Sequence, residues 1–211
     1  MIRNTTLDPP AGLYATRGKR WGDFIGSIVT LLILLPFLLL VALVIRLESR
    51  GGVLYRQERV GLRGKPFQLL KFRSMVSGAE RMGAGVLVER DDPRVTRFGR
   101  VIRRLSVDEL PQVVNIVRGE MSFIGPRPAL PYQVAQYDDT QRGRLLVRPG
   151  ITGWAQVNGR NAIPWDERIR LDLEYVERIG PRLDLAILAR TVPVVFGGGG
   201  RIARREYWKR S

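Results

Sequence analysis

The sequence predicts an α+β fold, mostly helical, in which a membrane-inserted helix precedes one small domain on the cytoplasmic side. Three observations predict this fold. A largely apolar run extends from Phe24 to Ile45, two short strand-like segments follow between residues 53 and 75, and helical patterns occupy much of the remainder. At 211 residues the chain has the length of one ordinary domain with an appendage.

Composition limits the chemistry before any motif is considered. The 35 lysines and arginines outnumber the 20 acidic residues and give a formal charge of +15, which favours polyanions such as nucleic acid, an anionic membrane surface or a phosphorylated substrate. Histidine and cysteine are both absent from the sequence, so thiolate nucleophiles, disulfides and the common zinc sites are excluded. Oxygen-liganded cations such as magnesium remain compatible with the chain.

The apolar run is long enough to cross a bilayer, since its roughly 22 residues give about 33 Å of helix against a hydrocarbon core of about 30 Å. It begins too far into the chain, and is too long, for an ordinary cleavable signal peptide. Pro36 lies just beyond its middle and cannot donate a hydrogen bond to the Leu32 carbonyl, so we expect the helix to break there.

Basic residues flank the run at both ends, from Arg17 to Arg20 before it and from Arg46 to Lys65 after it. The positive-inside rule therefore draws both ends to the cytoplasmic side. A re-entrant helix-break-helix that enters and leaves by one face satisfies both observations, and a single span remains the alternative. The backbone freed at the break needs partners in protein or at the interface.

Strand-type residues lie on either side of a turn from Gly61 to Pro66. Alternation in the second strand places Lys71 and Arg73 on one face. Solvated charges on a strand surface are the simplest explanation of that pair. The turn lacks the glycine spacing of a phosphate-binding P-loop.

An arginine-rich helix is predicted from about Arg97 to Arg104, and the segment Ser-Val-Asp-Glu that begins at Ser106 fits a capping box at the start of a second helix. The apolar stripe of that second helix is predicted to be Leu110, Val113, Val114 and Val117. Asp108 and Glu109 have two interpretations. Acids in a first turn complement the helix dipole and need no other purpose.

The alternative interpretation is a phosphoryl-transfer site. Adjacent helical residues point about 100° apart, so Asp108 and Glu109 cannot share one proton and must have separate roles. Arg103 precedes them by about one turn and Arg127 follows, and arginine binds phosphate bidentately. An aspartate beside such cations can attack phosphorus directly.

The C-terminal part of the sequence predicts a turn-rich loop at RPGITGWAQVNGRN and two helices, Trp165 to Ile179 and Leu183 to Phe196. The first helix carries an apolar face of Trp165, Ile169, Leu173 and Val176, which suits either core packing or the headgroup region. The second helix is too short to span a bilayer and suits an interfacial or buried position. A basic tail follows Gly197 to Gly200.

Four motifs, KFRSM, LSVDELPQ, RGEMSFIGPRPAL and VRPGITGWAQVNGRN, occur in the order found in the bacterial sugar transferases, the monotopic phosphoglycosyl transferases. The resemblance extends from about Trp21 to Val195. It implies an enzyme that moves a phosphosugar from a UDP-sugar to polyprenol phosphate and releases UMP, the first membrane step of a bacterial glycan. It also implies a re-entrant helix broken at Pro36, where Leu35 stands in place of the serine common in the family.

The resemblance assigns roles to particular residues. Asp108 resembles the nucleophile that forms a covalent phosphosugar-aspartate, with Mg²⁺ expected beside it. Glu109 completes the family's acidic dyad in a role that the sequence leaves open. Arg103 and Arg127 match phosphate-binding positions, and Lys71 and Arg148 match them more weakly.

The resemblance further divides the chain into a basic N-terminal segment (1–20), the re-entrant membrane helix (21–50), a catalytic domain with interfacial amphipathic helices (51–196) and a basic C-terminal tail (197–211). The implied partners are polyprenol phosphate, a UDP-sugar and the cytoplasmic face of the bacterial inner membrane, without nucleic acid. A homodimer is left open. Two other functions compete: a membrane-anchored polyanion binder in which Asp108 only caps a helix, and a metal-dependent diphosphate hydrolase.

Overall fold

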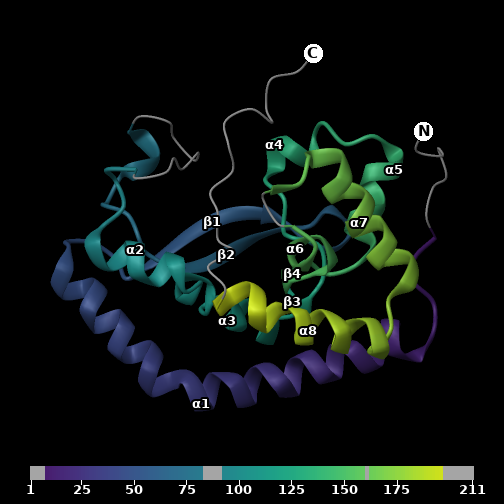
Figure 1. Cartoon of the computed structure of the whole chain (residues 1–211), viewed down its shortest axis with the longest axis horizontal. Helices are drawn as coiled ribbons and strands as arrows, with labels where there is room; N and C mark the ends of the chain where they lie inside the picture. The colour runs from purple at the N-terminus through teal and green to yellow at the C-terminus, as the bar shows by residue number, and fades with distance from the viewer. Residues whose placement is uncertain (1–7, 83–91, 160–161, 197–211) are drawn as a thin grey trace.

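The computed structural model describes residues 8–82, 92–159 and 162–196. A short π-helical turn, η1 (Tyr14–Gly18), leads directly into the long helix α1 (Lys19–Glu48). Figure 1 shows α1 bent near its middle and lying along one side of all the other elements. The expected interruption at Pro36 is not present, because α1 continues through this proline as one helix. A proline inside a helix bends it when the neighbouring backbone bonds persist.

Both halves of α1 contact the rest of the protein. In the C-terminal half, Val41 and Ile45 are buried against Phe72 and Ile102. In the N-terminal half, Arg20 donates to the carbonyls of Ile116 and Val117 at 2.8 and 3.0 Å. Between and around these contacts, large apolar side chains remain exposed, among them Ile25, Val29, Leu32, Ile33, Leu39, Leu40 and Leu43. By length and composition α1 could cross a membrane.

The strand pair predicted around Gly61 to Pro66 is confirmed. β1 (Leu54–Val60) pairs antiparallel with β2 (Pro66–Phe72), and Tyr55 lies opposite Lys71. The turn between them contains the single-turn helix η2 (Leu62–Gly64).

Lys71 and Arg73 contact different parts of the protein, and neither side chain is surrounded by solvent alone. Lys71 contacts Glu109, whereas Arg73 lies beyond the end of β2 and donates to the Ile45 and Ser49 carbonyls at the end of α1, at 3.3 and 2.7 Å. The expectation of two solvated strand charges is therefore wrong.

A second, parallel pair is formed by β3 (Ser122–Ile124) and β4 (Gly150–Thr152). The turn-rich motif that contains β4 was expected to be a loop, yet it also forms the helix α6 (Trp154–Val157). Close backbone approach explains its glycines. A Cβ on Gly125 would lie 2.3 Å from the Arg148 carbonyl oxygen, and one on Gly153 would lie 2.1 Å from the Gly125 carbonyl oxygen.

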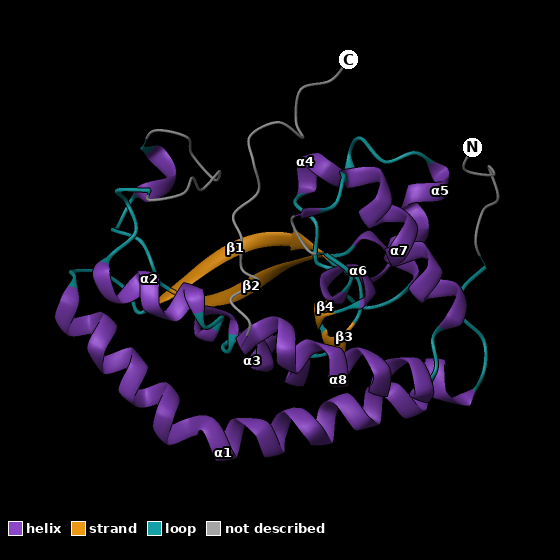
Figure 2. Cartoon of the chain, viewed as in Figure 1, coloured by secondary structure: helices purple, strands orange, loops and turns teal. Residues whose placement is uncertain are grey.

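Helices surround the two sheets, as Figure 2 shows, so the α+β, mostly helical prediction is confirmed. The remaining helices are η3 (Ala79–Arg81), α2 (Arg97–Arg104), η4 (Val107–Glu109), α3 (Gln112–Val117), α4 (Pro131–Val134), α5 (Asp139–Arg142), η5 (Gly143–Leu146), α7 (Trp165–Arg178) and α8 (Pro181–Phe196).

The helix α7 packs as core. Ile169, Leu173 and Val176 of its predicted apolar face are buried, and Trp165 packs against the same cluster as Ile169. The helix α8 buries Ile187 but exposes Leu185, Leu188 and Val192. The predicted basic tail from 197 to 211 lies outside the described residues.

The helix α3 differs from its predicted stripe. Val113 is buried as expected, but Val114 and Val117 are only partly buried, and Asn115 and Ile116 lie at the centre of the interface. Asn115 is buried because its amide completes the edge of β2: Leu70 N donates to its Oδ1 at 3.0 Å, and its Nδ2 donates to the Gln68 carbonyl at 2.8 Å. These two hydrogen bonds hold α3, and the turn η4 that precedes it, against β2, the strand that carries Lys71.

Candidate active site

Asp108 and Glu109 lie on η4, the single turn between α2 and α3. Ser106 precedes it with a φ of 56°, a left-handed conformation that ends α2 sharply. The predicted capping box is wrong, because the Ser106 side chain makes no capping hydrogen bond. Instead of returning to the backbone, the Glu109 carboxylate is bound by two cations, which form stronger, charge-assisted hydrogen bonds.

Glu109 is paired twice through one oxygen. Its Oε1 accepts from Lys71 Nζ at 2.9 Å and from an Arg127 terminal nitrogen at 2.7 Å. Burial alone would raise the pKa of Glu109, but the positive charges of Arg127 and Lys71 outweigh it and hold the pKa far below its ordinary value. Glu109 is therefore held in its ionised form and binds two basic side chains through one oxygen.

Asp108 is the opposite case. It makes no hydrogen bond or ion pair with any residue in the described part of the chain. Burial and the charge of Glu109 raise the pKa of Asp108, and the positive charge of Lys71 opposes them, so that the pKa lies at about 6. The carboxylate is ionised at neutral pH, unpaired, and more basic than an ordinary aspartate.

Two arginines complete this group. The partly buried Arg103, on α2, is near enough for its charge to lower the pKa of Asp108. Arg127 keeps 45% of its side chain exposed although it contacts Glu109. We call Lys71, Arg103, Asp108, Glu109 and Arg127 the catalytic cluster, after the role that is proposed for them below. The structure thus brings together five of the six side chains that the sequence predicted.

Arg148 lies apart from the catalytic cluster. Its Nε donates to the Gly119 carbonyl at 2.9 Å, and its charged neighbours are Arg20 and Asp23 of α1. These contacts indicate a structural role for Arg148 between α1 and the Gly119 carbonyl. The structure does not bring Arg148 to Asp108.

Sequence reasoning missed Arg59. This side chain donates from its NH1 nitrogen to the Pro128 carbonyl at 2.8 Å and from its NH2 nitrogen to Gln57 Oε1 at 2.6 Å. Burial, together with the charge of Arg127, lowers the pKa of Arg59 to about 10. Alternation along β1 could have found it, since Tyr55, Gln57 and Arg59 share the face of Lys71 across the sheet.

The carboxylate oxygens of Asp108 and Glu109 suit a hard cation that is bound partly by the protein and partly by substrate. No cluster of three or more acidic side chains occurs among the residues that the structure describes, so an all-protein cage is not formed there. Mg²⁺ commonly takes one or two carboxylates plus phosphate and water oxygens. The unpaired Asp108 carboxylate and the second oxygen of Glu109 fit that requirement.

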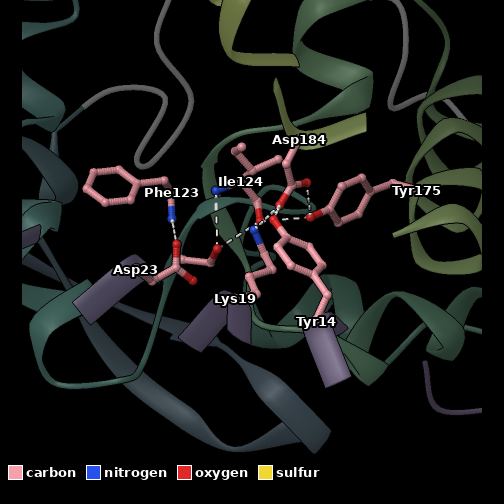
Figure 3. Close-up of polar contacts among 8 residues, drawn as sticks. Tyr14, Lys19, Asp23, Phe123, Ile124, Tyr175 and Asp184 are labelled. Atoms are coloured by element: carbon pink, nitrogen blue, oxygen red, sulfur yellow. Dashed lines mark hydrogen bonds and ion pairs between the residues drawn. The ribbon is translucent and has the colours of Figure 1, made fainter. Parts of the chain in front are cut away.

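A second polar group, the anchor cluster, joins the N-terminal part of α1 to the domain (Figure 3). Asp184 is its centre. Its Oδ2 accepts from Tyr14 Oη and Lys19 Nζ, each at 2.6 Å, and its Oδ1 accepts from Tyr175 Oη at 2.9 Å. Asp23, also in this cluster, accepts from the Phe123 backbone N–H at 3.2 Å. These bonds connect α1 and η1 to α7, α8 and β3.

The comparisons with known proteins agree on one family. The description "Bacterial sugar transferase" belongs to the family whose profile matches residues 14–198. The uncharacterised sugar transferase EpsL of Bacillus subtilis is 44% identical over 182 residues, which cover 86% of this chain and 89% of EpsL.

Two longer relatives carry activity in their names. The undecaprenyl-phosphate glucose phosphotransferase of Komagataeibacter xylinus is 45% identical over 82% of this chain and 35% of its own length. The UDP-glucose:undecaprenyl-phosphate glucose-1-phosphate transferase of Escherichia coli K12 is 40% identical over 82% of this chain and 39% of its own length. The chain therefore spans little more than a third of these two relatives.

Proposed function

The chain belongs to the bacterial sugar transferase family, and from this premise we propose that it transfers a phosphosugar from a UDP-sugar to polyprenol phosphate and releases UMP. The observation that carries the proposal is that the two neighbouring carboxylates of η4 have different partners and different pKa shifts. The ionised Glu109 forms ion pairs with Lys71 and Arg127, whereas its neighbour Asp108 is unpaired and has a raised pKa. A structural cap would need only one of the two carboxylates.

In the proposed first step, an Asp108 carboxylate oxygen attacks the phosphorus that bears the sugar. The new bond joins Asp108 to that phosphorus, and the bond to the UMP oxygen breaks, so UMP leaves with the electron pair. Arg103 and Arg127 are suited to binding the diphosphate oxygens, because guanidinium groups pair bidentately with phosphate. Lys71, which pairs with Glu109 and whose charge acts on Asp108, adds a third positive charge at the same place.

In the proposed second step, a polyprenol phosphate oxygen attacks the same phosphorus and displaces the Asp108 carboxylate. The product is polyprenyl-diphosphate-sugar, and the free enzyme is regenerated. The acceptor needs access from the membrane. Val107, directly before Asp108, packs against the cluster that contains Val41 and Ile45 of α1, which supports a reacting carboxylate close to the membrane surface.

Magnesium is part of the proposal, with Asp108 as its protein ligand and Glu109 beside it. When bound, the cation would neutralise the diphosphate and stabilise the departing UMP. Lys71, Arg103 and Arg127 act on one or both of the same two carboxylates, so they would share the neutralisation of the substrate charge with the cation.

We further propose that α1 enters and leaves the bilayer through the cytoplasmic face of the bacterial inner membrane. Residues in both halves of α1 contact the same small domain, through Arg20 at one end and Val41 and Ile45 at the other. A straight span would carry one of these ends to the opposite side. The exposed apolar residues Leu185, Leu188 and Val192 support an interfacial position for α8.

The test is UMP release in nanodiscs from a panel of UDP-sugars, with and without polyprenol phosphate and magnesium, for wild type, Asp108→Asn and Glu109→Gln. We expect sustained, lipid-dependent release by wild type and a stoichiometric burst without lipid. Asp108→Asn should abolish both. The exposed Asp166→Asn is the matched control.

The same assay separates the competing functions. A diphosphate hydrolase would release products without lipid at the full rate, and a polyanion binder would show no turnover and bind equally well after Asp108→Asn. Either result would exclude the transferase.

A further inference from the structure

The loop that carries Arg127 is held at every main-chain oxygen from Pro126 to Ala129. The Pro126 carbonyl accepts from Gly150 N at 2.9 Å, and the Ala129 carbonyl accepts from Val60 N at 3.0 Å. The Pro128 carbonyl accepts from Arg59. Prolines at 126 and 128 also restrict φ on either side of the arginine. A loop fixed in this way can aim one side chain accurately.

The remaining oxygen, that of Arg127 itself, accepts from an NH2 nitrogen of Arg144 at 3.3 Å. Arg144 belongs to η5 and is almost completely buried, with 4% of its side chain exposed. It lies over the rings of Tyr137 and Trp165, each 5.6 Å from its guanidinium carbon. It also donates to the Tyr137 hydroxyl.

Asp172 of α7 balances the Arg144 charge from the far side. The two side chains pair at 2.6 Å, and only 2% of the Asp172 side chain is exposed. The pair links α7, through Arg144, to the carbonyl of the residue that contacts Glu109. A continuous chain of contacts therefore runs from the core helix to the catalytic cluster.

Stability alone does not account for this ion pair. Burying two charges costs desolvation, and well-packed apolar residues of similar volume often give equal or greater stability. The arrangement is also incompletely satisfied, since Arg144 Nε and Asp172 Oδ1 are buried without a hydrogen-bond partner in the described part of the chain. An apolar pair could not replace the hydrogen bonds that Arg144 donates to the Tyr137 hydroxyl and to the Arg127 carbonyl, and only the second of these reaches the loop that carries Arg127.

We propose that the Arg144–Asp172 ion pair is a positioning device that sets Arg127 against Glu109 and the donor diphosphate. Neither residue contacts the catalytic cluster except through Arg127. This inference rests on the proposed function for its activity readout, and it names residues that the resemblance did not.

The test is a double-mutant cycle on UMP release, with Arg127→Gln and Asp172→Asn alone and combined in the full chain. We expect each single change to lower donor kcat/KM by about 10- to 100-fold, because small misplacements of a binding group have effects of this size. If Asp172 acts only through Arg127, the combined variant should be no slower than Arg127→Gln alone. Fully multiplicative losses, or wild-type activity in Asp172→Asn, would overturn the proposal.

Two further variants keep the test decisive. Glu174→Gln removes an exposed ion pair from the same helix and should leave kcat/KM unchanged. If Asp172→Asn does not fold, Tyr137→Phe removes one hydrogen bond from Arg144 and should lower kcat/KM about 3- to 10-fold, as expected for one hydrogen bond. That loss should also disappear in the Arg127→Gln background, and its persistence there would overturn the proposal.

Amide hydrogen exchange provides a readout that does not depend on turnover. Asp172→Asn, or Tyr137→Phe in its place, should speed exchange across residues 122–131, and Arg127→Gln should not. If wild type releases no UMP from any donor, the proposed function fails while exchange still decides the positioning role. Unchanged exchange in the segment would then refute it.

Discussion

Two aspartates show how differently this protein uses the same side chain. Asp184, in the anchor cluster, accepts hydrogen bonds from Tyr14, Lys19 and Tyr175 and is 4% exposed. Asp108, in the catalytic cluster, has no hydrogen-bond or ion-pair partner among the described residues and has a pKa raised to about 6. A carboxylate whose oxygens are fully bonded holds elements together, and one left unbonded beside cations is available for chemistry.

The largest expected effect is on turnover. Asp108→Asn should lower UMP release by about 10³-fold or more, because loss of the proposed covalent nucleophile would remove both chemical steps. Asp184→Asn should keep most of its activity per folded molecule. Comparable losses of specific activity in both variants would contradict the distinction between the clusters.

The next largest effect is on stability. Asp184→Asn should lower the free energy of unfolding by about 3 kcal/mol, because the Lys19 ammonium, 11% exposed, would remain buried without its anion. Thermal and denaturant unfolding in detergent, followed by tryptophan fluorescence, would measure it. The exposed Asp139→Asn should change the free energy by less than about 0.5 kcal/mol.

Asp108→Asn should stabilise the magnesium-free protein at pH 7.5, by about 2 kcal/mol. The pKa of Asp108 is raised in the folded state from 3.8 to about 6, so the folded protein binds more protons than the unfolded chain between these values. Stability contributed by this group is therefore lost as pH rises through that window. The gain of the variant should shrink as pH falls towards 4, and a pH-independent gain would rule out this explanation.

The smallest effect is a pH dependence of rate. Because Asp108 attacks as the carboxylate in the proposed mechanism, donor kcat/KM should fall about tenfold per pH unit below pH 6 and level off above it. The pH profile of UMP release at low donor concentration measures this. If donor kcat/KM instead falls only below about pH 4, Asp108 has an ordinary pKa in the substrate-free enzyme.

The members of the catalytic cluster were largely predictable from the sequence, because Lys71, Asp108, Glu109 and Arg127 lie in the motifs that carry the family resemblance and Arg103 lies about one helical turn before Asp108. The different roles of Asp108 and Glu109 could not be predicted from the sequence. The capping box predicted at Ser106 failed because cations from β2 and the Arg127 loop, distant in sequence, take the Glu109 carboxylate. Alternation along β1 also places Arg59 on the same face as Tyr55, which lies opposite Lys71, so a position near this site could have been predicted for Arg59.

The anchor cluster could not be predicted, since Asp184 lies 170 residues from Tyr14 and 165 residues from Lys19, and each of the three resembles an ordinary surface residue in its local context. The same holds for Arg144 and Asp172. Pairings of this kind depend on which elements pack together, and no local pattern carries that information.

The sequence by itself determined the apolar helix, the strand pair, the helical content and the charged residue types of the candidate site, because these follow from local periodicity, turn residues and chemistry. Tertiary structure alone decided that α1 bends without breaking and contacts the domain in both halves, and that Asp108 stays free while Glu109 is paired. The physical reason is that partners, burial and pKa depend on through-space contacts in a desolvated interior, which arise only once distant segments have folded together.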